Sequence, residues 1–374
     1  MRGKIITILF IILIFGFGAF NLLMPDQAFS ENENRYLAQS PAFSPSALAD
    51  GSYMQKLGEY MTDQFPFRNQ WVGLKTLTEL SVGKQDSGGV YFGKDGYLIE
   101  MFDQVDEDRY EKNWKTVKAF SDDAEQTQGI RVQTMLVPAA SGILKDHLPA
   151  NTPEVDEGAL LEQARAGGVP LFDVTDVLQA HDTEYIYYKT DHHWTSLGAY
   201  YAYQAWQESL GKETKPLTAY TEEVLSDQFY GTTYSKANLY TVKPDTITAY
   251  YTKDQVEVSY NSGSETATSA YAKSYLQVKD KYSVFFNGNQ PVTEIKGRNP
   301  QGGNLLLIKD SYANTFAQFA LEDYAEVHLI DLRYYKESVV DYIKEHQISD
   351  VLILYSLKNF AGDKDIYALS TGVR

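Results

Sequence analysis

The sequence contains a short segment in which a carboxylate and two imidazoles are adjacent. Asp191, His192 and His193 follow one another just before a predicted helix. In an extended segment, residues two apart face the same side, so we expect Asp191 and His193 to share a side and His192 to face the other. A carboxylate beside an imidazole fixes its tautomer and stabilises the imidazolium, which is the orienting role in a Ser-His-Asp triad. In the alternative interpretation, Asp191 caps the helix and the histidines pack or face water.

A second segment supplies a candidate nucleophile. Ser311 follows the apolar run 305–308 and the polar residues Lys309 and Asp310, and it precedes a predicted helix. This order places Ser311 at the carboxyl end of a buried strand, where open α/β sheets carry their sites. Its backbone N–H would lie at a helix start and could help to stabilise a developing oxyanion. Because a serine after a strand is also a common helix N-cap, a structural role is the alternative.

Alternating helices and strands must position these two segments. Strands that are apolar throughout and alternate with helices predict an α/β fold with a parallel sheet covered on both faces. The expected helices span 106–127, 156–166, 196–210, 312–321 and 336–346, and the expected strands span 132–137, 171–174, 305–308, 327–331 and 351–355. A β-hairpin is expected over 89–99. Residues 215–295 are rich in Tyr, Thr, Val and Ser, so we expect an inserted β region there.

The composition excludes several kinds of site. The chain has 374 residues, a formal net charge of −17 and no cysteine. A cysteine nucleophile, a cysteine-ligated zinc site and a disulfide framework are therefore excluded. The acidic balance disfavours nucleic acid as a partner, because phosphate binding requires a basic surface. The chain has six histidines, and any histidine-dependent chemistry must use one of them. We expect no metal and no cofactor.

The amino-terminal segment is apolar. Residues 5–24 contain two polar residues and follow Arg2 and Lys4. Such a run can cross a hydrocarbon core of ~30 Å at about 1.5 Å per residue, and the preceding positive charges favour a body outside the cell. A cleaved signal peptide is the alternative, although no Ala-x-Ala site follows. The expected parts are a transmembrane anchor over 1–24, an extracytoplasmic tether with helices and a hairpin over 25–100, and an α/β domain over 101–374.

Taken together, the two segments resemble the DHHW family, whose name spells the motif Asp191-His192-His193-Trp194. Members of that family look like SGNH hydrolases and the alginate O-acetylation proteins. In those acetylation proteins the catalytic Asp and His belong to an Asp-x-His-Trp motif, and the serine lies in a Gly-Asp-Ser-like segment. The resemblance therefore implies that Asp191 is the acid, His193 the general base and Ser311 the nucleophile.

The sequence departs from the SGNH pattern near the serine. Lys309 stands before Asp310, where an SGNH block usually has glycine, and a clear Gly-x-Asn-Asp block is absent. Asn289 is the nearest candidate for an asparagine that stabilises the oxyanion. The residues that we expect to contact a substrate are Tyr188, Trp194, Asn289, Tyr312 and Arg333.

The resemblance implies an SGNH-hydrolase-like (flavodoxin-like) fold and an O-acetyltransferase outside the cell, held at the cell membrane by a single span. An acetyl group would pass from Ser311 to a hydroxyl of a cell-surface or secreted polysaccharide. The implied partner is a multi-span membrane O-acyltransferase that supplies acetyl groups. A polysaccharide acetylesterase and a non-catalytic polysaccharide-binding or assembly subunit are the alternatives. Asp-His-His also marks a family of metal-dependent phosphodiesterases, but the further aspartate motifs of that family are not found in this sequence.

Overall fold

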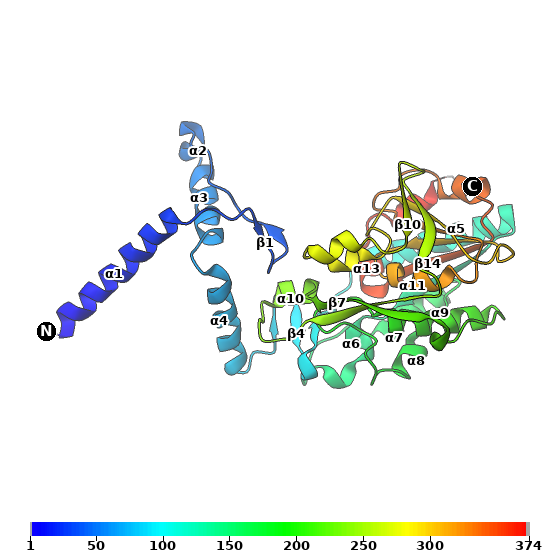
Figure 1. Ribbon diagram of the computed structural model, residues 1–374, viewed down its shortest axis with the longest axis horizontal. Helices are drawn as coiled ribbons and strands as arrows, with labels where there is room; N and C mark the ends of the chain where they lie inside the picture. The colour runs from blue at the N-terminus through cyan, green and yellow to red at the C-terminus, as the bar shows by residue number, and fades with distance from the viewer. Residues whose placement is uncertain (1, 372–374) are drawn as a thin grey trace. The chain divides into compact units, whose positions relative to one another are not determined.

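The computed structural model of the protein describes residues 2–371. The chain separates into two compact units, and Figure 1 labels many of their helices and strands. The smaller unit holds the residues up to Gly88 together with Tyr234–Val242, and the larger unit holds Gly89–Thr233 and the residues from Lys243 onward. Both segments that the sequence singles out, around residues 191 and 311, belong to the larger unit.

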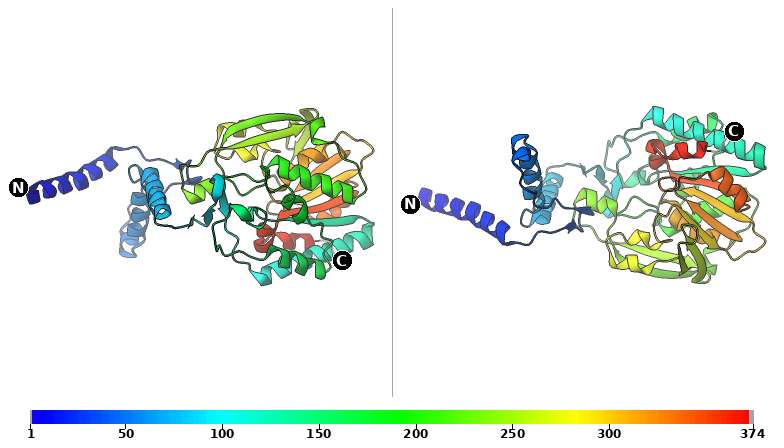
Figure 2. Two further views of the ribbon diagram at one scale, coloured as in Figure 1. Left: turned by 90° about the horizontal axis from the view of Figure 1, so that it is seen from below. Right: turned by 90° about the horizontal axis from the view of Figure 1, so that it is seen from above.

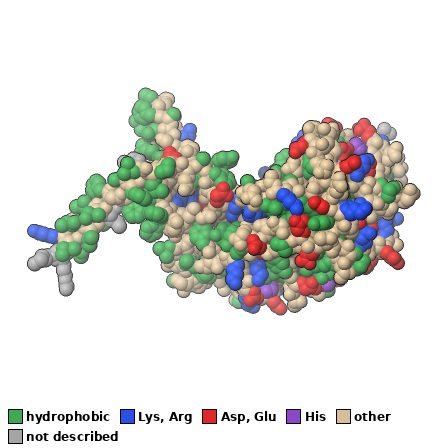
Figure 3. Space-filling view, in the orientation of Figure 1, with side chains coloured by type: hydrophobic (Ala, Val, Ile, Leu, Met, Phe, Trp, Pro, Cys, Tyr) green, Lys and Arg blue, Asp and Glu red, His purple; other side chains and the backbone are tan. Residues whose placement is uncertain are grey.

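The smaller unit begins with the apolar helix α1 (Arg2–Leu23), whose visible side chains are mostly hydrophobic in Figure 3. Within it, Gly3–Asn21 is long and apolar enough to cross a membrane, a property that a membrane anchor and a signal sequence share. The other elements of this unit are β1 (Phe29–Ser30), β2 (Arg35–Tyr36), α2 (Pro45–Ala49), α3 (Ser52–Asp63), α4 (Arg68–Ser81) and β3 (Asp86–Ser87). Arg35 ties β2 to the end of α3 by donating to both oxygens of Asp63 at 2.8 and 2.6 Å.

A seven-stranded sheet forms the centre of the larger unit, in the order β10-β9-β11-β13-β12-β14-β6. Its strands are β6 (Arg131–Val137), β9 (Gln255–Tyr260), β10 (Glu265–Ser269), β11 (Val292–Lys296), β12 (Asn304–Lys309), β13 (Glu326–Ile330) and β14 (Asp350–Ser356). The strands β6, β14, β12 and β13 are parallel, whereas β11, β9 and β10 continue the sheet in antiparallel pairing. The sheet is therefore mixed, which corrects the expectation of a parallel sheet.

Helices cover both faces of this sheet, as Figure 2 shows. Successive side chains of β12 point to opposite faces of the sheet. Leu305 and Leu307 pack in one hydrophobic cluster, and Leu306 and Ile308 pack in the other. The first cluster includes residues of α9 (Ser196–Ser209) and α11 (Ala313–Ala320), and the second includes residues of α5 (Glu107–Gln128), α7 (Glu157–Ala166), α12 (Val339–Glu345) and α13 (Leu357–Gly362). The apolar strands expected from the sequence are thus buried between two helical layers.

Most of the expected elements are confirmed to within a few residues, because each has a strong apolar period or a clear terminal signal. At α5, for example, Asp106 caps the first turn and Gly129 ends the helix with a φ of 68°. The expected hairpin is confirmed as β4 (Val90–Phe92) paired with β5 (Leu98–Glu100). The strand expected over 171–174 is reduced to a bridge between Leu171 and Thr134.

The expected inserted β region divides between two structures. Its strands β7 (Thr221–Phe229) and β8 (Asp245–Tyr251) form a separate two-stranded sheet. In contrast, β9 and β10 pair with β11 and extend the central sheet. An antiparallel extension of this kind carries the same residue types as a free-standing β insertion, so composition alone does not tell them apart.

Candidate active site

Ser311 lies directly after β12, just before α11. The strand β12 is buried and runs between β13 and β14, parallel to both. Asp310 fixes the following turn, because its Oδ1 accepts the N–H of Tyr312 at 2.9 Å and its Oδ2 accepts the N–H of Ser356 at 3.0 Å. The half-buried Ser311 is therefore held at the carboxyl end of a parallel strand.

The loop that carries the histidines is held from β8. Asp245 accepts the backbone N–H of Lys189 at 2.9 Å and that of Thr190 at 2.7 Å, and it also accepts the Thr190 hydroxyl at 2.5 Å. Burial raises the pKa of Asp245, although these hydrogen bonds oppose the shift. Asp245 is not predicted from the sequence, since it lies 55 residues away from Thr190 and no local pattern marks it.

The side chains of Asp191, His193 and Ser311 form one hydrogen-bonded chain. The distance from His193 Nδ1 to Asp191 Oδ1 is 2.5 Å, and that from His193 Nε2 to Ser311 Oγ is 2.7 Å. Asp191 and His193 are 3% and 5% exposed, so water has little access to either group. In this geometry the imidazole can take the proton of the serine hydroxyl while the carboxylate fixes the imidazole tautomer.

The Asp191 carboxylate is surrounded by donors. Its Oδ1 accepts the backbone N–H of His193 at 3.0 Å, and its Oδ2 accepts the N–H and the hydroxyl of Thr232 at 2.7 and 3.0 Å. Burial raises the pKa of Asp191, but the imidazoles of His192 and His193 and these hydrogen bonds more than offset that effect and hold the pKa well below its ordinary value. The carboxylate therefore stays ionised at neutral pH, as an orienting group requires.

Gly231 packs against Asp191 so closely that a side chain there would displace the carboxylate. A Cβ at position 231 would lie 2.3 Å from both Cβ and Oδ2 of Asp191. We expect Gly231→Ala to lower turnover of an acetyl ester by about 100-fold through misplacement of His193, and to destabilise the fold by about 1–3 kcal/mol. The matched control is Gly362→Ala, where an added Cβ meets no atom within 4 Å. Unchanged turnover in Gly231→Ala would contradict this packing.

His192 lies against the same carboxylate as His193, which corrects the expectation that it faces the other side. The ring centroids of the two histidines are 3.9 Å apart, and His192 Nδ1 is 3.6 Å from Asp191 Oδ1. The cause is that this segment bends, whereas the two-residue period applies only to extended chain. The Nδ1 atom of His192 contacts the Thr232 hydroxyl at 2.6 Å, whereas the imidazole that contacts Ser311 is that of His193.

Two aromatic side chains position the imidazole and the backbone around Ser311. Tyr282 stacks on His193 with ring centroids 3.9 Å apart, and its hydroxyl donates to the Ser311 carbonyl at 3.1 Å. Trp194 donates its indole N–H to the Tyr312 carbonyl at 2.9 Å. Tyr282 is not predicted from the sequence, because nothing local distinguishes it among 29 tyrosines.

The residues predicted to contact a substrate differ in burial. Trp194 has no exposed surface and donates its indole N–H to the Tyr312 carbonyl, and substrate contact by Trp194 stays a prediction. Tyr188 and Tyr312 are also buried but line a small pocket. The Tyr188 hydroxyl has no hydrogen-bond partner among residues 2–371. Arg333 is half-buried and donates to both oxygens of Asp331 at 2.8 and 2.5 Å. For Tyr188, Tyr312 and Arg333, substrate contact stays a prediction.

Lys309, where the sequence departs from the SGNH pattern, is buried next to the predicted oxyanion asparagine. Its ammonium donates to Asn289 Oδ1 and to Asn314 Oδ1, each at 2.8 Å, and it lies 3.9 Å from Asp331. These contacts hold the oxygen of the Asn289 amide, which leaves the NH₂ end of that side chain as the donor. A role of Asn289 in stabilising an oxyanion remains a prediction.

We expect the burial of Lys309 to make stability depend on alkaline pH. Burial lowers the pKa of this ammonium from its ordinary 10.5 to about 8, although Asp331 opposes the shift. Between these two values the unfolded chain binds more protons than the folded chain, so the contribution of Lys309 to stability rises with pH. The melting temperature of the wild type relative to Lys309→Met should therefore increase from pH 8 to pH 10. A constant difference across this range would contradict the lowered pKa.

The acidic and imidazole groups of this site could also hold a metal ion. Asp191, His192 and His193 offer ligand atoms that lie within 4.8 Å of one another. Both oxygens of Asp191 already accept hydrogen bonds, from His193 and from Thr232. In this structure the three side chains are engaged with one another, with Thr232 and, through His193, with Ser311.

The fold and the site define an α/β protein with a Ser-His-Asp arrangement at the carboxyl end of a parallel strand. Residues 132–330, more than half of the chain, match the family described as DHHW protein. The chain therefore belongs to the DHHW family, as the motif at Asp191-His192-His193-Trp194 predicts.

Named relatives and solved structures are similar to parts of this chain. A Pseudomonas aeruginosa protein described as the probable alginate O-acetylase AlgJ is 26% identical over 174 residues, or 44% of each chain. The chain thus spans about half the length of the curated relatives it matches. The crystal structure of a DHHW family protein from Eubacterium siraeum has 25% identity and a TM-score of 0.67, covering 77% of this chain and 97% of that one. Bacillus cereus PatB1 shares the fold at 20% identity and a TM-score of 0.60, covering 73% and 97%.

Proposed function

We propose that this protein is an O-acetyltransferase that modifies a cell-surface or secreted polysaccharide outside the cell. The observation that carries the proposal is the chain of hydrogen bonds from Asp191 through His193 to Ser311. The naming of relatives as alginate O-acetylases supports acetyl as the transferred group and a glycan as the acceptor.

The proposed reaction has two half-reactions at Ser311. His193 Nε2 takes the hydroxyl proton while Oγ attacks the acetyl carbonyl, and the donor leaves with a proton returned by His193. In the second half, His193 deprotonates a sugar hydroxyl, which attacks the carbonyl of acetyl-Ser311; the ester bond to Oγ breaks, and His193 returns the proton to Oγ as the acetylated sugar leaves. The Ser311 N–H, at the turn before α11, would stabilise the oxyanion in both halves. Asp191 keeps its charge throughout and orients the imidazole.

The proposed organisation follows from the same assignment. Residues 1–24 would anchor the chain in the cell membrane, 25–100 would form the extracytoplasmic tether with helices and a hairpin, and 101–374 would form an SGNH-like domain. A multi-span membrane O-acyltransferase is the proposed source of acetyl groups. Acetyl groups used outside the cell must first cross the membrane. A protein that is anchored close to the bilayer and receives these groups on Ser311 fits such a partner.

A polysaccharide acetylesterase and a non-catalytic binding subunit are the competing functions. The same three side chains run hydrolysis when water replaces the sugar hydroxyl, so only acceptor binding and water exclusion separate the two reactions. The binding subunit is favoured by the departure from the SGNH pattern at Lys309, although the buried ammonium of Lys309 contacts Asn289, Asn314 and Asp331.

The decisive experiment compares transfer with hydrolysis. The full-length chain in detergent is given a chromogenic acetyl ester together with candidate oligosaccharides, and products are identified by mass spectrometry. We expect acetylated sugar in excess of free acetate. Free acetate as the sole product across the glycans would favour the esterase. Neither product, together with no acetylated Ser311, would favour the binding subunit.

A further inference from the structure

A second cluster of histidines and carboxylates lies on the sheet, apart from Ser311. Glu294 belongs to β11, His328 to β13, and His346 ends α12. These side chains offer three ligand atoms, all within 4.8 Å of one another. In the parallel pairing, His328 is level with Leu306, five residues before Ser311. At about 3.3 Å per residue, the cluster is therefore roughly 16 Å along the strand from the nucleophile.

The register of the sheet brings the cluster together. Glu294 and His328 are direct partners in the antiparallel pair β11–β13, so their side chains leave the same face of the sheet. The helix α12 covers this face and brings His346, which stacks on Tyr342 with ring centroids 4.0 Å apart. Asn304 fixes the backbone there by donating to the His346 carbonyl at 2.9 Å. Three separate elements thus converge on one point.

The distances fit a small cation with imidazole and carboxylate ligands. His346 Nδ1 is 3.4 Å from Glu294 Oε1. Bonds of about 2.0–2.1 Å to a tetrahedral Zn²⁺ place neighbouring ligand atoms about 3.4 Å apart. The third ligand, His328, is linked to Glu294 through the Tyr342 hydroxyl. That hydroxyl is 2.8 Å from His328 Nδ1 and 3.4 Å from Glu294 Oε1. An ion between the three ligand atoms would replace the Tyr342 hydroxyl as the partner of His328 Nδ1.

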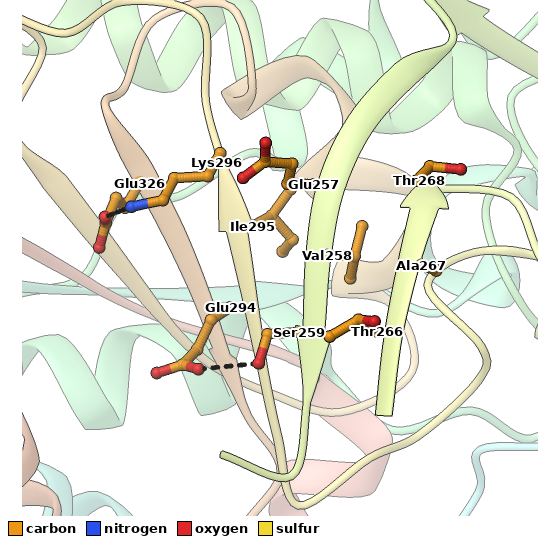
Figure 4. A pocket seen from close by; sticks show the side chains of 10 residues that line it. All are labelled: Glu257, Val258, Ser259, Thr266, Ala267, Thr268, Glu294, Ile295, Lys296 and Glu326. Carbon is orange, nitrogen blue, oxygen red and sulfur yellow. Dashed lines mark hydrogen bonds and ion pairs between the residues drawn. The ribbon is translucent and has the colours of Figure 1, made fainter. Parts of the chain in front are cut away.

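The surroundings supply an outer hydrogen bond and a route from solvent. Glu326 Oε2 is 3.2 Å from His328 Nε2, which is the carboxylate–histidine contact that orients metal-bound imidazoles. Glu294 and Glu326 also line a pocket on β9, β10 and β11, shown in Figure 4. There Glu294 accepts the hydroxyl of Ser259 and Glu326 pairs with Lys296. Glu294 is thus shared by the cluster and this pocket.

We propose that Glu294, His328 and His346 bind a divalent transition-metal ion of the Zn²⁺ type, through Oε1, Nδ1 and Nδ1 respectively. A water molecule completes the four ligands, and Glu326 orients His328 from outside. Imidazole nitrogens select Zn²⁺ and its neighbours over Mg²⁺ and Ca²⁺. The ion joins β11, β13 and α12, so its role is to stabilise the sheet and not to take part in chemistry at Ser311. Without an ion, the same side chains would form only a hydrogen-bonded network, and this is the competing explanation.

The test measures metal binding directly. The full-length chain, freed of its affinity tag and stripped with a chelator, is titrated with Zn²⁺ by calorimetry and with Co²⁺ by visible absorption. We expect the wild type to bind Zn²⁺ with an excess of Mg²⁺ present, and Zn²⁺ to raise its melting temperature. The half-buried ligands allow mild variants, and His346→Gln and Glu294→Gln should each weaken binding at least about tenfold.

Two control variants make the result specific. His181 pairs with Glu184 at 2.6 Å and stacks on Tyr201, so His181→Gln removes a comparable histidine that lies outside the cluster. Binding should be unchanged in His181→Gln and retained in His192→Gln. The proposal is overturned if the wild type binds no Zn²⁺ at about 100 μM, or if His346→Gln and Glu294→Gln bind as tightly as the wild type. It is also overturned if His192→Gln alone removes binding, which would place the ion at Asp191.

Discussion

Replacing Ser311 by alanine is expected to abolish both the transfer of acetyl to sugar and the hydrolysis of an acetyl ester, with a loss in kcat of at least about 10³-fold. Both products arise from one acetyl-serine, so removal of the hydroxyl that contacts His193 Nε2 at 2.7 Å stops both paths. Rates are measured with the full-length chain and a chromogenic ester, and sugar products by mass spectrometry. Intact-protein mass spectra after rapid quenching should show one added acetyl group in the wild type and none in Ser311→Ala.

The control for this variant is Ser209→Ala at the end of α9. The exposed Ser209 donates its hydroxyl to the Trp206 carbonyl at 2.7 Å. Loss of one such hydrogen bond at the surface should change stability only modestly. We expect normal turnover and a normal acetyl adduct in Ser209→Ala. Turnover by Ser311→Ala that equals the Ser209→Ala rate would rule out Ser311 as the nucleophile, and melting temperatures of both variants exclude unfolding as the cause.

The second large effect separates the two adjacent histidines. His193→Ala should lower kcat by at least about 10³-fold, because it removes the base between Ser311 and Asp191. His192→Ala should lower kcat by no more than about tenfold, because the His192 ring contacts Thr232 and supports Asp191 from the side. Each variant is the other's control, since both remove an imidazole from the same bend.

The measurement is kcat with the chromogenic ester, together with the fraction of acetylated protein after quenching. His193→Ala should show neither turnover nor adduct. A reversal, with His192→Ala inactive and His193→Ala active, would show that the base is assigned to the wrong residue. Equal and large losses in both variants would mean that the bend has collapsed, which circular dichroism and melting temperature can test.

The sequence was sufficient to predict the elements that carry the site. The strand β12 and the polar residues after it lie where the apolar run 305–308 indicates, because a buried parallel strand has few other interpretations. The helix α9 begins at Ser196, directly after Thr195 caps it, so the position of His193 before a helix was also predictable. Local signals of these kinds act over a few residues and survive any tertiary context.

Contacts between distant segments could not be predicted from such signals. Asp245 and Gly231 lie 54 and 40 residues after Asp191 and shape its loop, and their partners are known only once the chain is folded. The position of His192 was predicted wrongly for a related reason, since the hydrogen bonds to Asp245 bend a segment that reads as extended. The antiparallel pairing of β9 with β11 could not be predicted from the sequence, because the partner of a strand depends on the topology of the whole sheet.

The two outermost strands of the central sheet are each protected against pairing with another chain. β10 has five residues, mostly polar and exposed, and its register shifts between Ala267 and Ser269. On the other side, Pro170 and Phe172 exchange backbone hydrogen bonds with Thr134 of β6 at 2.9 and 2.8 Å. Short, polar, bulged or covered edges prevent strand addition and aggregation. A protein anchored in a membrane, as we propose for this chain, is concentrated in two dimensions. Neighbouring copies in the membrane could then collide without their central sheets pairing edge to edge.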